Sequence, residues 1–340
     1  MAKLTQNLTS NSYENFIRKL ILGPLAMAYG FSQLVYRQYW SSRKPKPRGS
    51  LLPLFVVGGL RAGGSGKTSV VLKMARLLKS HGLRVGVLAY WIRKPFWDKA
   101  SLVFVGTGLT ELTSKSSWKL CSDEAVLLFR SSGARVFVTR NRSEAWSILS
   151  RKNEFDVLIS DDGLMDPRLN QAFRIVLRET FENPGLMDLL PAGPYRLTMA
   201  ILGKVNCIAS GPNPSEKDLE TGMWFRRTLE FPPSFDRKLA WWIVCGLGNP
   251  KRLTEDLLQL GIQIAGCLTG PNHGIPSKSR WLKARKQAPG CGFLCTEKDW
   301  VKLQEFAAIF GNLALIQEQI ELSREFEQAI LNFLSIETTS

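Results

Sequence analysis

The sequence predicts an α/β protein in which a parallel sheet is covered by helices on both faces. Strand-like apolar runs alternate with helix-like segments along most of the 340 residues, which is the order that parallel sheets require. One strand–helix junction also carries a glycine-rich sequence of the P-loop type. The chain length and the 44% apolar content allow a large core and favour either two domains or one domain with a sizeable second lobe.

The apolar runs place the expected strands along the chain. They lie near residues 53–57, 84–88, 102–105, 135–139, 156–160, 174–177, 205–210, 239–245, 262–267 and 292–295. Helix-like segments separate several of them, and a final helix is expected over 322–334. Proline-containing segments after residue 210 are typical of turns or linkers. We therefore expect an N-terminal segment over 1–48, a P-loop nucleotide-binding core over 49–210, and a second, smaller α/β lobe over 211–340.

The N-terminal segment differs from the rest of the chain. Residues 20–36 are mostly apolar, with basic residues on both sides and aromatic residues towards the end. The run is marginal for a membrane span, which needs about 20 residues, and Gly23, Pro24 and Gly30 interrupt it. This pattern favours a helix that lies in the membrane interface. A helix packed on the soluble domain is an alternative, and a signal peptide is another, since Ala26-Met27-Ala28 resembles a cleavage site.

Charge and cysteine content narrow the class of partner. A formal net charge of +16 predicts an anionic partner, either a nucleic acid or a membrane surface. No nucleic-acid recognition motif accompanies the charge, so we expect a membrane surface and no nucleic acid. The six cysteines form no C-x-x-C pair, which argues against a zinc site or a disulfide framework and favours a reducing compartment.

The glycine-rich segment is expected to bind the phosphates of a nucleotide. Its backbone N–H groups and the N-terminus of the following helix favour an anion. Lys67 is expected to reach the β- and γ-phosphates, and the Thr68 hydroxyl to bind Mg²⁺. The strict pattern has glycine at position 61, and an ordinary glycine-rich turn is the alternative interpretation. The predicted cofactor-binding residues are Arg61, Ala62, Gly63, Gly64, Ser65, Gly66, Lys67 and Thr68.

Two carboxylates end the apolar run at 155–160. Asp161 and Asp162 stand at the end of a core strand, where P-loop enzymes hold Mg²⁺ or its waters, although Asp-Asp-Gly is also a common turn. The chain has two histidines. His81 is expected at the end of a helix without a catalytic role. His273 follows a strand in a loop, where catalytic groups collect, but a single loop histidine is more often a bystander.

Two further polar segments have a simple structural interpretation. Asp123 and Glu124 begin a helix-like segment, where the helix dipole favours acidic residues. Thr296 and Asp299 fit a capping arrangement at the start of another helix. Neither segment is specific for a function by itself.

Taken together and in order, these segments resemble the tetraacyldisaccharide 4'-kinase family, the lipid A 4'-kinases. The resemblance runs from about residue 16 to residue 303, and the P-loop of that family also lacks the first glycine. Gly-Asp-Glu-Pro of the family is matched by 122–125, Asp-Asp-Gly-Phe-Gln-His by 161–166, and Leu-Leu-Pro-Ala-Gly-Pro-Leu-Arg-Glu by 189–197. Its Gly-Ile/Leu-Gly-Asn-Pro is matched by 246–250, Pro-Asp-His by 271–273 and Thr-Glu-Lys-Asp by 296–299.

The resemblance implies an activity. ATP would phosphorylate the 4'-hydroxyl of tetraacyldisaccharide 1-phosphate, an anionic glycolipid, with Mg²⁺, during lipid A biosynthesis. The protein would work at the cytoplasmic face of the bacterial inner membrane, bound peripherally or monotopically through its N-terminal helix. The motifs do not specify an oligomeric state.

The resemblance also implies residue roles. Asp123 and His273 would form a dyad, in which Asp123 orients the imidazole and His273 accepts the hydroxyl proton, and Lys67 would complete the catalytic set. The implied metal-binding residues are Thr68, Asp161, Asp162 and Glu124, and the implied substrate-binding residues are Arg142, Arg196, Asn249 and Lys298.

Several positions depart from the family pattern. Residues 89–92 replace a Ser-Arg-Gly-Tyr segment, with Arg93 and Lys94 close by; Asp166 replaces histidine, Leu197 replaces glutamate and Asn272 replaces aspartate. The alternatives are therefore a kinase with a different lipid or sugar acceptor, or a weakened nucleotide-binding relative at the membrane. A GTPase or metal-insertion ATPase is less favoured, because residues 296–299 fail the guanine-recognition pattern and the chain lacks clustered histidine or cysteine.

Overall fold

The computed structural model describes residues 2–42, 51–90, 103–105, 109–112, 121–179, 182–246, 250–270, 276–303 and 313–335. The larger of its two sheets has the strand order β3-β4-β5-β2-β6-β1-β7-β8. Neighbouring strands are parallel except in the pairs β3–β4 and β4–β5. The strands are β1 (Leu54–Gly59), β2 (Val85–Tyr90), β3 (Val103–Val105), β4 (Leu109–Glu111), β5 (Arg135–Thr139), β6 (Val157–Asp161), β7 (Phe173–Arg178) and β8 (Cys207–Ser210).

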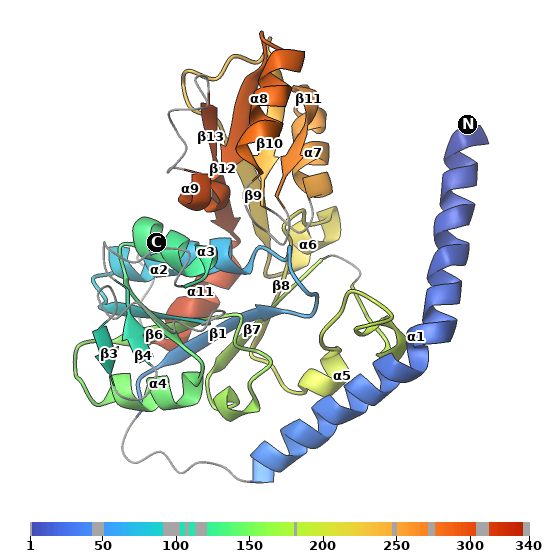
Figure 1. The fold of residues 1–340 in the computed structure, drawn as a ribbon. Helices are drawn as coiled ribbons and strands as arrows, with labels where there is room; N and C mark the ends of the chain where they lie inside the picture. The colour runs from blue at the N-terminus through green and yellow to red at the C-terminus, as the bar shows by residue number, and fades with distance from the viewer. Residues whose placement is uncertain are drawn as a thin grey trace.

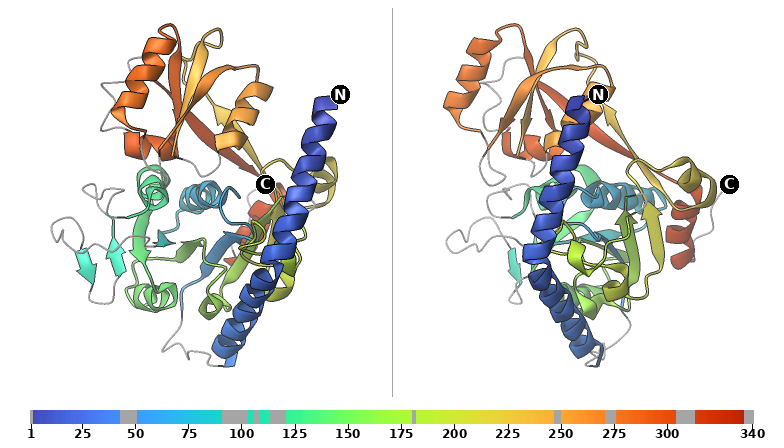
Figure 2. Two further views of the ribbon diagram at one scale, coloured as in Figure 1. Left: turned by 45° about the vertical axis from the view of Figure 1, so that its right-hand side comes forward. Right: turned by 90° about the vertical axis from the view of Figure 1, so that its right-hand side faces the viewer.

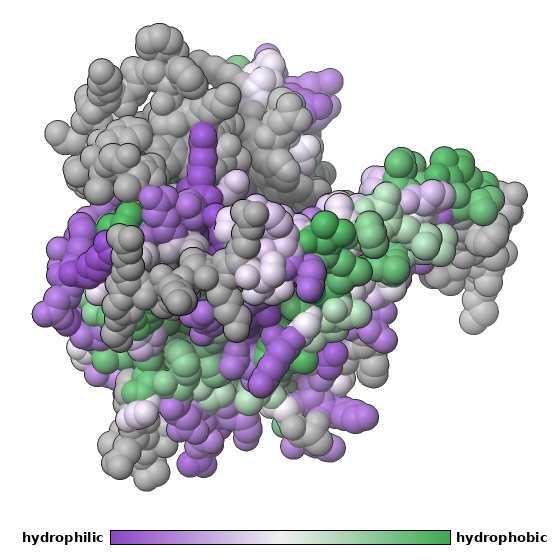
Figure 3. All heavy atoms as spheres, turned by 90° about the horizontal axis from the view of Figure 1, so that it is seen from below, coloured by the Kyte–Doolittle hydropathy of each residue, from purple (hydrophilic) through white to green (hydrophobic). Residues whose placement is uncertain are grey.

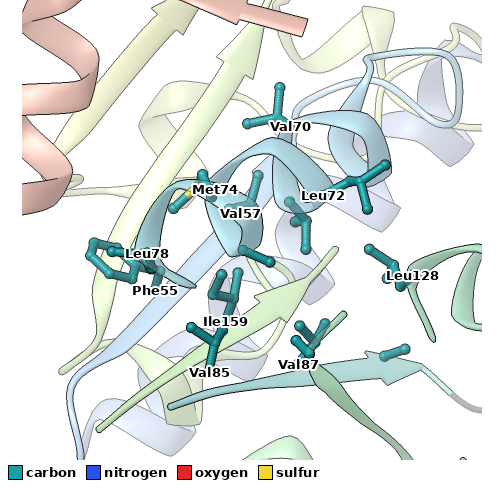
Figure 4. Close-up of a cluster of buried hydrophobic side chains, with 14 of the residues drawn as sticks. Phe55, Val57, Val70, Leu72, Met74, Leu78, Val85, Val87, Leu128 and Ile159 are labelled. Carbon is teal, nitrogen blue, oxygen red and sulfur yellow. The ribbon is translucent and has the colours of Figure 1, made fainter. Parts of the chain in front are cut away.

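Helices cover both faces of this sheet, as the sequence predicts (Figure 1). The two faces of β1 alternate, with Phe55 and Val57 in one apolar cluster and Leu54 and Val56 in the other. In Figure 4, side chains of the first cluster from β1 and from the helix after it lie close together. The first face is covered by α2 (Lys67–Ser80), α3 (Asp123–Ser132) and α11 (Arg324–Phe333), and the second by α1 (Ala2–Ser42), α4 (Arg142–Ser150) and α5 (Met199–Leu202).

A second sheet forms the smaller lobe, drawn above the first sheet in Figure 1. Its order is β11-β10-β12-β13-β9, with β9 antiparallel to β13 and the other pairs parallel. The elements of this part of the chain are α6 (Glu216–Thr221), β9 (Phe225–Glu230), β10 (Ala240–Cys245), α7 (Pro250–Gln259), β11 (Gln263–Thr269), α8 (Lys278–Gln287), β12 (Gly292–Thr296), α9 (Glu297–Leu303) and β13 (Leu313–Leu322).

The last helix packs against the first sheet, not the second. Phe326, Ile330 and Leu331 belong to the apolar cluster that contains β1, and the Phe333 ring centroid lies 5.1 Å from that of Phe55. The second sheet is thus inserted between β8 and α11. The domain boundaries at residues 48 and 210 stay a prediction, whereas the α/β class with a second lobe and an N-terminal helix is confirmed.

The N-terminal helix α1 runs along the outside of the first lobe (Figure 2). A Cβ on Gly23 would lie 2.7 Å from Met187 Cε, and one on Gly30 would lie 2.9 Å from Leu189 Cδ1. The glycines therefore let α1 approach the short helix η2 (Leu186–Asp188) closely. Pro24 lies within the helix, where it removes one backbone donor, and α1 bends along its length (Figure 1).

The outer face of α1 is apolar. Figure 3 shows its hydrophobic side chains as a green band on the surface seen from below. The large exposed apolar side chains of this face are Ile17, Leu20, Ile21, Leu25, Met27, Phe31, Leu34, Val35, Tyr36 and Tyr39. Among the described residues, no helix is both long and apolar enough to cross a membrane.

Candidate active site

The glycine-rich loop joins β1 to α2. Gly63, Gly64 and Gly66 have φ of +79°, +73° and +72°, a region that glycine enters without strain. Arg61 needs no such freedom, because its backbone pairs with Tyr195 in an isolated β-bridge. The departure from the strict motif therefore has a structural reason. The loop ends at the N-terminus of α2, where the first backbone N–H groups have no partner within the helix.

Lys67, Thr68 and the two aspartates meet at the carboxyl ends of β1 and β6. Lys67 is buried, and its Nζ lies 4.0 Å from Asp162 Oδ1. The Thr68 hydroxyl donates to Asp161 Oδ2 at 3.1 Å. Asp161 is 6% exposed, and its Oδ1 has no hydrogen-bond partner. Burial, aided by the charge of Asp162, raises the pKa of Asp161 to about 6. A buried carboxylate oxygen without a partner, beside a hydroxyl, suits a divalent cation.

Two arginines hold the turn after β6. Arg196 makes a bidentate pair with the carboxylate of Asp162, whose φ is +52°. Burial would raise the pKa of Asp162, but the charges of Lys67 and Arg196 outweigh it and lower that pKa. Arg142 donates from Nη2 to the carbonyl oxygen of Asp161 at 2.6 Å. Both expected substrate-binding arginines are therefore placed at the aspartates.

Tyr90 occupies the segment where the Ser-Arg-Gly-Tyr motif is absent. The guanidinium carbon of Arg142 lies 5.0 Å from the centre of its ring, which is a cation–π distance. Tyr90 and Arg142 therefore form one contact on the wall of the cavity. Arg93 and Lys94, the basic residues close to the missing motif arginine, lie outside the described residues.

The acidic pair at the start of α3 meets two lysines of α9. Ser122 caps α3 by accepting from Ala125 N, and the next two side chains reach across to the second lobe. Asp123 Oδ2 lies 2.5 Å from Lys302 Nζ, and Glu124 Oε1 lies 2.5 Å from Lys298 Nζ. Burial would raise the pKa of Asp123, but the charges of Lys298 and Lys302 hold it well below its usual range. The other oxygen of Glu124 is buried without a partner.

Of the remaining residues considered in the sequence, some lie outside the described residues and others have a defined position. His273, Asn249 and Asn272 lie outside the described residues, so the dyad stays a prediction. His81 ends α2 with Nδ1 2.9 Å from Leu77 O and is exposed, which confirms its position at a helix end. Leu197, at the position of the family's glutamate, is fully buried in an apolar cluster.

The capping interpretation of the segment at 296–299 is confirmed. The N–H of Asp299 donates to Thr296 Oγ1 at 3.3 Å, and the Thr296 hydroxyl donates to Asp299 Oδ2 at 2.9 Å. The other oxygen of Asp299 accepts from Gly246 N at 2.9 Å. This cap therefore also fixes the end of β10, where the Gly-Leu-Gly-Asn-Pro segment begins.

Asp166, which replaces the motif histidine, is paired within its own turn. Its two oxygens each accept from Arg168 at 2.8 Å, and the Arg168 guanidinium lies 5.3 Å from the centre of the Trp40 ring. Arg37 is buried and donates to Leu164 O at 2.7 Å. The end of α1 is thereby attached to the loop that follows the two aspartates.

The glycine-rich loop and the groups around the two aspartates line one cavity of about 820 Å³ between the two lobes, whereas Asp123 and Lys302 do not line it. The loop, the aspartates, Glu124 and both arginines line it from the first lobe, and Gln33 and Tyr36 of α1 also contribute. Sequence reasoning missed Arg140, Arg227 and Arg252, which line the same cavity. Arg252 stands two positions after Pro250, the last residue of a matched motif, and this position in the sequence is the one signal that could have identified it.

Comparisons with known proteins agree with this arrangement. A family model described as Tetraacyldisaccharide-1-P 4'-kinase matches residues 18–335. The chain is 31% identical over 296 residues to a protein of Hamiltonella defensa named Tetraacyldisaccharide 4'-kinase, covering 85% of this chain and 86% of the relative. A protein of the same name from Haemophilus influenzae is 32% identical over 272 residues, covering 78% and 76%.

A solved structure shares the fold. It is LpxK from Aquifex aeolicus in complex with ATP, with a TM-score of 0.67 and 23% identity, and it covers 93% of this chain and 99% of that chain. The family model spans almost the whole chain, and the segments that it matches include the P-loop, the aspartates and the second lobe. The chain therefore belongs to the tetraacyldisaccharide-1-P 4'-kinase family.

Proposed function

We propose that the protein transfers the γ-phosphoryl group of ATP to the 4'-hydroxyl of tetraacyldisaccharide 1-phosphate in lipid A biosynthesis. One observation carries the proposal: the P-loop and the carboxylates of Asp161 and Asp162 face the same cavity, which α1 borders with an apolar outer surface. A nucleotide site and the route for a lipid acceptor therefore meet there.

The transfer would need little covalent chemistry from the protein. The acceptor oxygen forms a bond to the γ-phosphorus as the bond to the β,γ-bridging oxygen breaks, and ADP leaves. The hydroxyl proton passes to a base, for which the resemblance favours His273, oriented by Asp123. Lys67, buried at the start of α2, would neutralise charge on the phosphates.

The residues present fit Mg²⁺. Among the described residues no group of three or more His, Cys, Asp or Glu side chains is placed to hold a metal. Asp161 with its unpartnered oxygen and the Thr68 hydroxyl would hold the ion. Asp162, whose two oxygens accept from Arg196, and Glu124, whose Oε2 has no partner, stay predicted ligands. Mg²⁺ usually keeps several waters and phosphate oxygens as ligands, so few protein groups suffice. When bound, it would neutralise charge on the β- and γ-phosphates.

We further propose that α1 binds the membrane peripherally, at the cytoplasmic face of the inner membrane. Its outer face exposes Leu20, Ile21, Leu25, Phe31 and Val35, which would bury apolar area in the lipid interface. The +16 net charge would add attraction to anionic lipids. Because Gln33 and Tyr36 of the same helix line the cavity, an acceptor held in the membrane would reach the site along α1.

A transfer assay tests the activity. It combines γ-labelled ATP, Mg²⁺ and tetraacyldisaccharide 1-phosphate in detergent micelles, with Lys67→Ala as the blank. Label in the lipid, absent from the blank, is expected. If the protein binds ATP but no lipid is labelled, tetraacyldisaccharide 1-phosphate is not its acceptor. A kinase for a different lipid, or a relative with weakened activity, is then the second candidate function, and the departures from the family pattern at Asp166, Leu197 and Asn272 favour it.

A separate assay tests the membrane proposal. A variant lacking residues 1–40 should fail to float with vesicles of anionic lipid, whereas the intact chain should float. Flotation of the shortened chain would show that another surface binds the membrane.

A further inference from the structure

Arg252 extends from the second lobe into the P-loop. It lies in the first turn of α7, and its Nη1 donates to the carbonyl oxygen of Gly64 at 2.6 Å, across 188 positions of sequence. Its side chain is 24% exposed and lines the cavity described above. It is therefore a cation that the second lobe brings to the phosphate-binding loop.

Among the described residues, no carboxylate lies within hydrogen-bond distance of the Arg252 guanidinium. Its acceptor, the carbonyl of Gly64, is neutral. The nearest carboxylate oxygen among the described residues, Oε1 of Glu179, is 3.9 Å away, and Oε2 of the same carboxylate lies 3.6 Å from Arg61. Burial and the positive charge of Arg227 lower the pKa of Arg252, and the negative charges of Glu179, Asp256 and Glu318 offset this lowering only in part. A partly buried guanidinium in this position would be stabilised by an additional anion.

The position of Arg252 beside the P-loop indicates that this additional anion is a nucleotide phosphate. Backbone N–H groups of a P-loop, together with its lysine, surround the β- and γ-phosphates. No heavy atom lies within 4 Å of a Cβ built on Gly63 or Gly64, so the space beside them is open. Arg252, hydrogen-bonded to Gly64, lines the same cavity as these two glycines. We propose that Arg252 binds the terminal phosphate of ATP and thereby makes nucleotide binding depend on the second lobe; this inference rests on the proposed function.

A chain of polar contacts holds α7 in place independently of Arg252. Arg227 of β9 pairs with Asp256, one turn further along α7, and donates to Glu318 Oε1 at 3.1 Å. Glu318 accepts in turn from the hydroxyl of Ser69, the residue after Thr68, at 2.9 Å. Arg252 is thereby presented to the loop by contacts in which it takes no part, so its replacement should leave the lobes in place.

Binding of ATP and of ADP, each with Mg²⁺, tests the inference by calorimetry on the full chain. Arg252→Ala should raise the Kd for ATP about tenfold or more, because a hydrogen-bonded charge pair is lost, and should change the Kd for ADP little. Arg252→Lys should restore part of the preference for ATP, since it keeps the charge but not the planar fork. The readout is the ratio of the two Kd values, which a merely structural role would not change.

The control is Arg226→Ala. Arg226 is an exposed arginine of the same lobe, paired with Glu321 at 3.4 Å and lying over the Trp224 ring at 5.2 Å. The Arg226→Ala variant should bind ATP and ADP with the same Kd values as the unchanged chain. An equal loss of ATP and ADP affinity in Arg252→Ala, or a lower melting temperature with an unchanged ratio, would overturn the inference. If the unchanged chain binds no ATP, the proposed function itself fails, and the inference fails with it.

Discussion

Arg196 holds Asp162 with two hydrogen bonds, from Nη1 to Oδ2 at 2.9 Å and from Nη2 to Oδ1 at 3.1 Å. The pair lies next to Lys67, whose Nζ is 4.0 Å from the same carboxylate. Two cations thus share one carboxylate at the edge of the cavity. Arriving phosphates would compete for both of them, and the bidentate geometry keeps Asp162 oriented until they do.

Replacing Arg196 should therefore impair transfer more than nucleotide binding. We expect Arg196→Lys to lower kcat about 10²-fold, the size of effect seen when one positioned donor is removed from an active site. Steady-state transfer of labelled phosphate measures this, with Arg237→Ala as the exposed control. Full activity in Arg196→Lys would show that a single charge suffices and that the fork is dispensable.

The pKa of Asp161 predicts a pH dependence. Because its pKa is raised to about 6 in the fold, the folded state binds more protons than the unfolded state between about pH 4 and pH 6. Stability should therefore fall as pH rises through this window. Chemical denaturation from pH 4 to pH 7 measures it, and Asp161→Asn should lack this component. If the stability of Asp161→Asn changes with pH as that of the unchanged chain does, Asp161 is not the group responsible for the pH dependence.

The affinity for Mg²⁺ should rise with pH over the same range, because Asp161 would be one of its ligands. The ion needs the ionised carboxylate, so affinity should weaken about tenfold per pH unit below about pH 6. Titrating Mg²⁺ against the enzyme–ATP complex at pH 5, 6 and 7 measures this. Equal Mg²⁺ affinity at pH 5 and pH 7 would exclude Asp161 as a ligand.

The dyad makes a prediction about non-additivity. Asp123→Ala and His273→Ala should each lower kcat by 10²- to 10⁴-fold with little change in ATP affinity. The double variant should be no slower than the slower single variant, because the two residues would act as one unit. Additive losses would mean that Asp123 acts elsewhere, for instance through Lys302, its partner at 2.5 Å.

The close contact of α1 can be tested at Gly30. A leucine there would collide with Leu186 and Leu189, because a Cβ alone already lies 3.0 Å and 2.9 Å from their side chains. Gly30→Leu should lower the free energy of unfolding by about 1–3 kcal/mol. Urea unfolding measures it. Ser32→Leu, on the exposed side of the same helix, is the matched control, and an equal effect of both variants would contradict close packing.

Most of the first sheet was predictable because its central strands are buried on both faces. β1, β5 and β6 are mainly apolar, and each ends near the residue expected. β4, β9 and β13 were not expected. β9 and β13 carry charged or amide side chains along much of their length, as in Phe225–Glu230, and pair antiparallel at one edge of the second sheet. Polar alternation of this kind does not differ enough from an exposed helix or loop to be recognised.

At the active site, contacts between residues far apart in the sequence could not be predicted either. The P-loop, Asp161 and Asp162 follow from local pattern, because parallel strands bring their carboxyl ends to one edge. Arg252 and Lys302 did not follow, since each finds its partner more than 170 positions away in sequence. Gly23 and Gly30 were interpreted as interruptions of an apolar run, whereas in the structure they are contact points.

The packing of α11 on the first sheet has a consequence for biogenesis. Residues 324–333 supply Phe326, Ile330 and Leu331 to the core that surrounds β1. A ribosome must therefore synthesise the entire second lobe before the nucleotide core can close, and contacts of such long sequence separation form slowly. A premature stop codon anywhere in the second lobe would thus expose the apolar interior of the first, and the truncated product would be a substrate for chaperones and proteases instead of a free-standing ATP-binding domain.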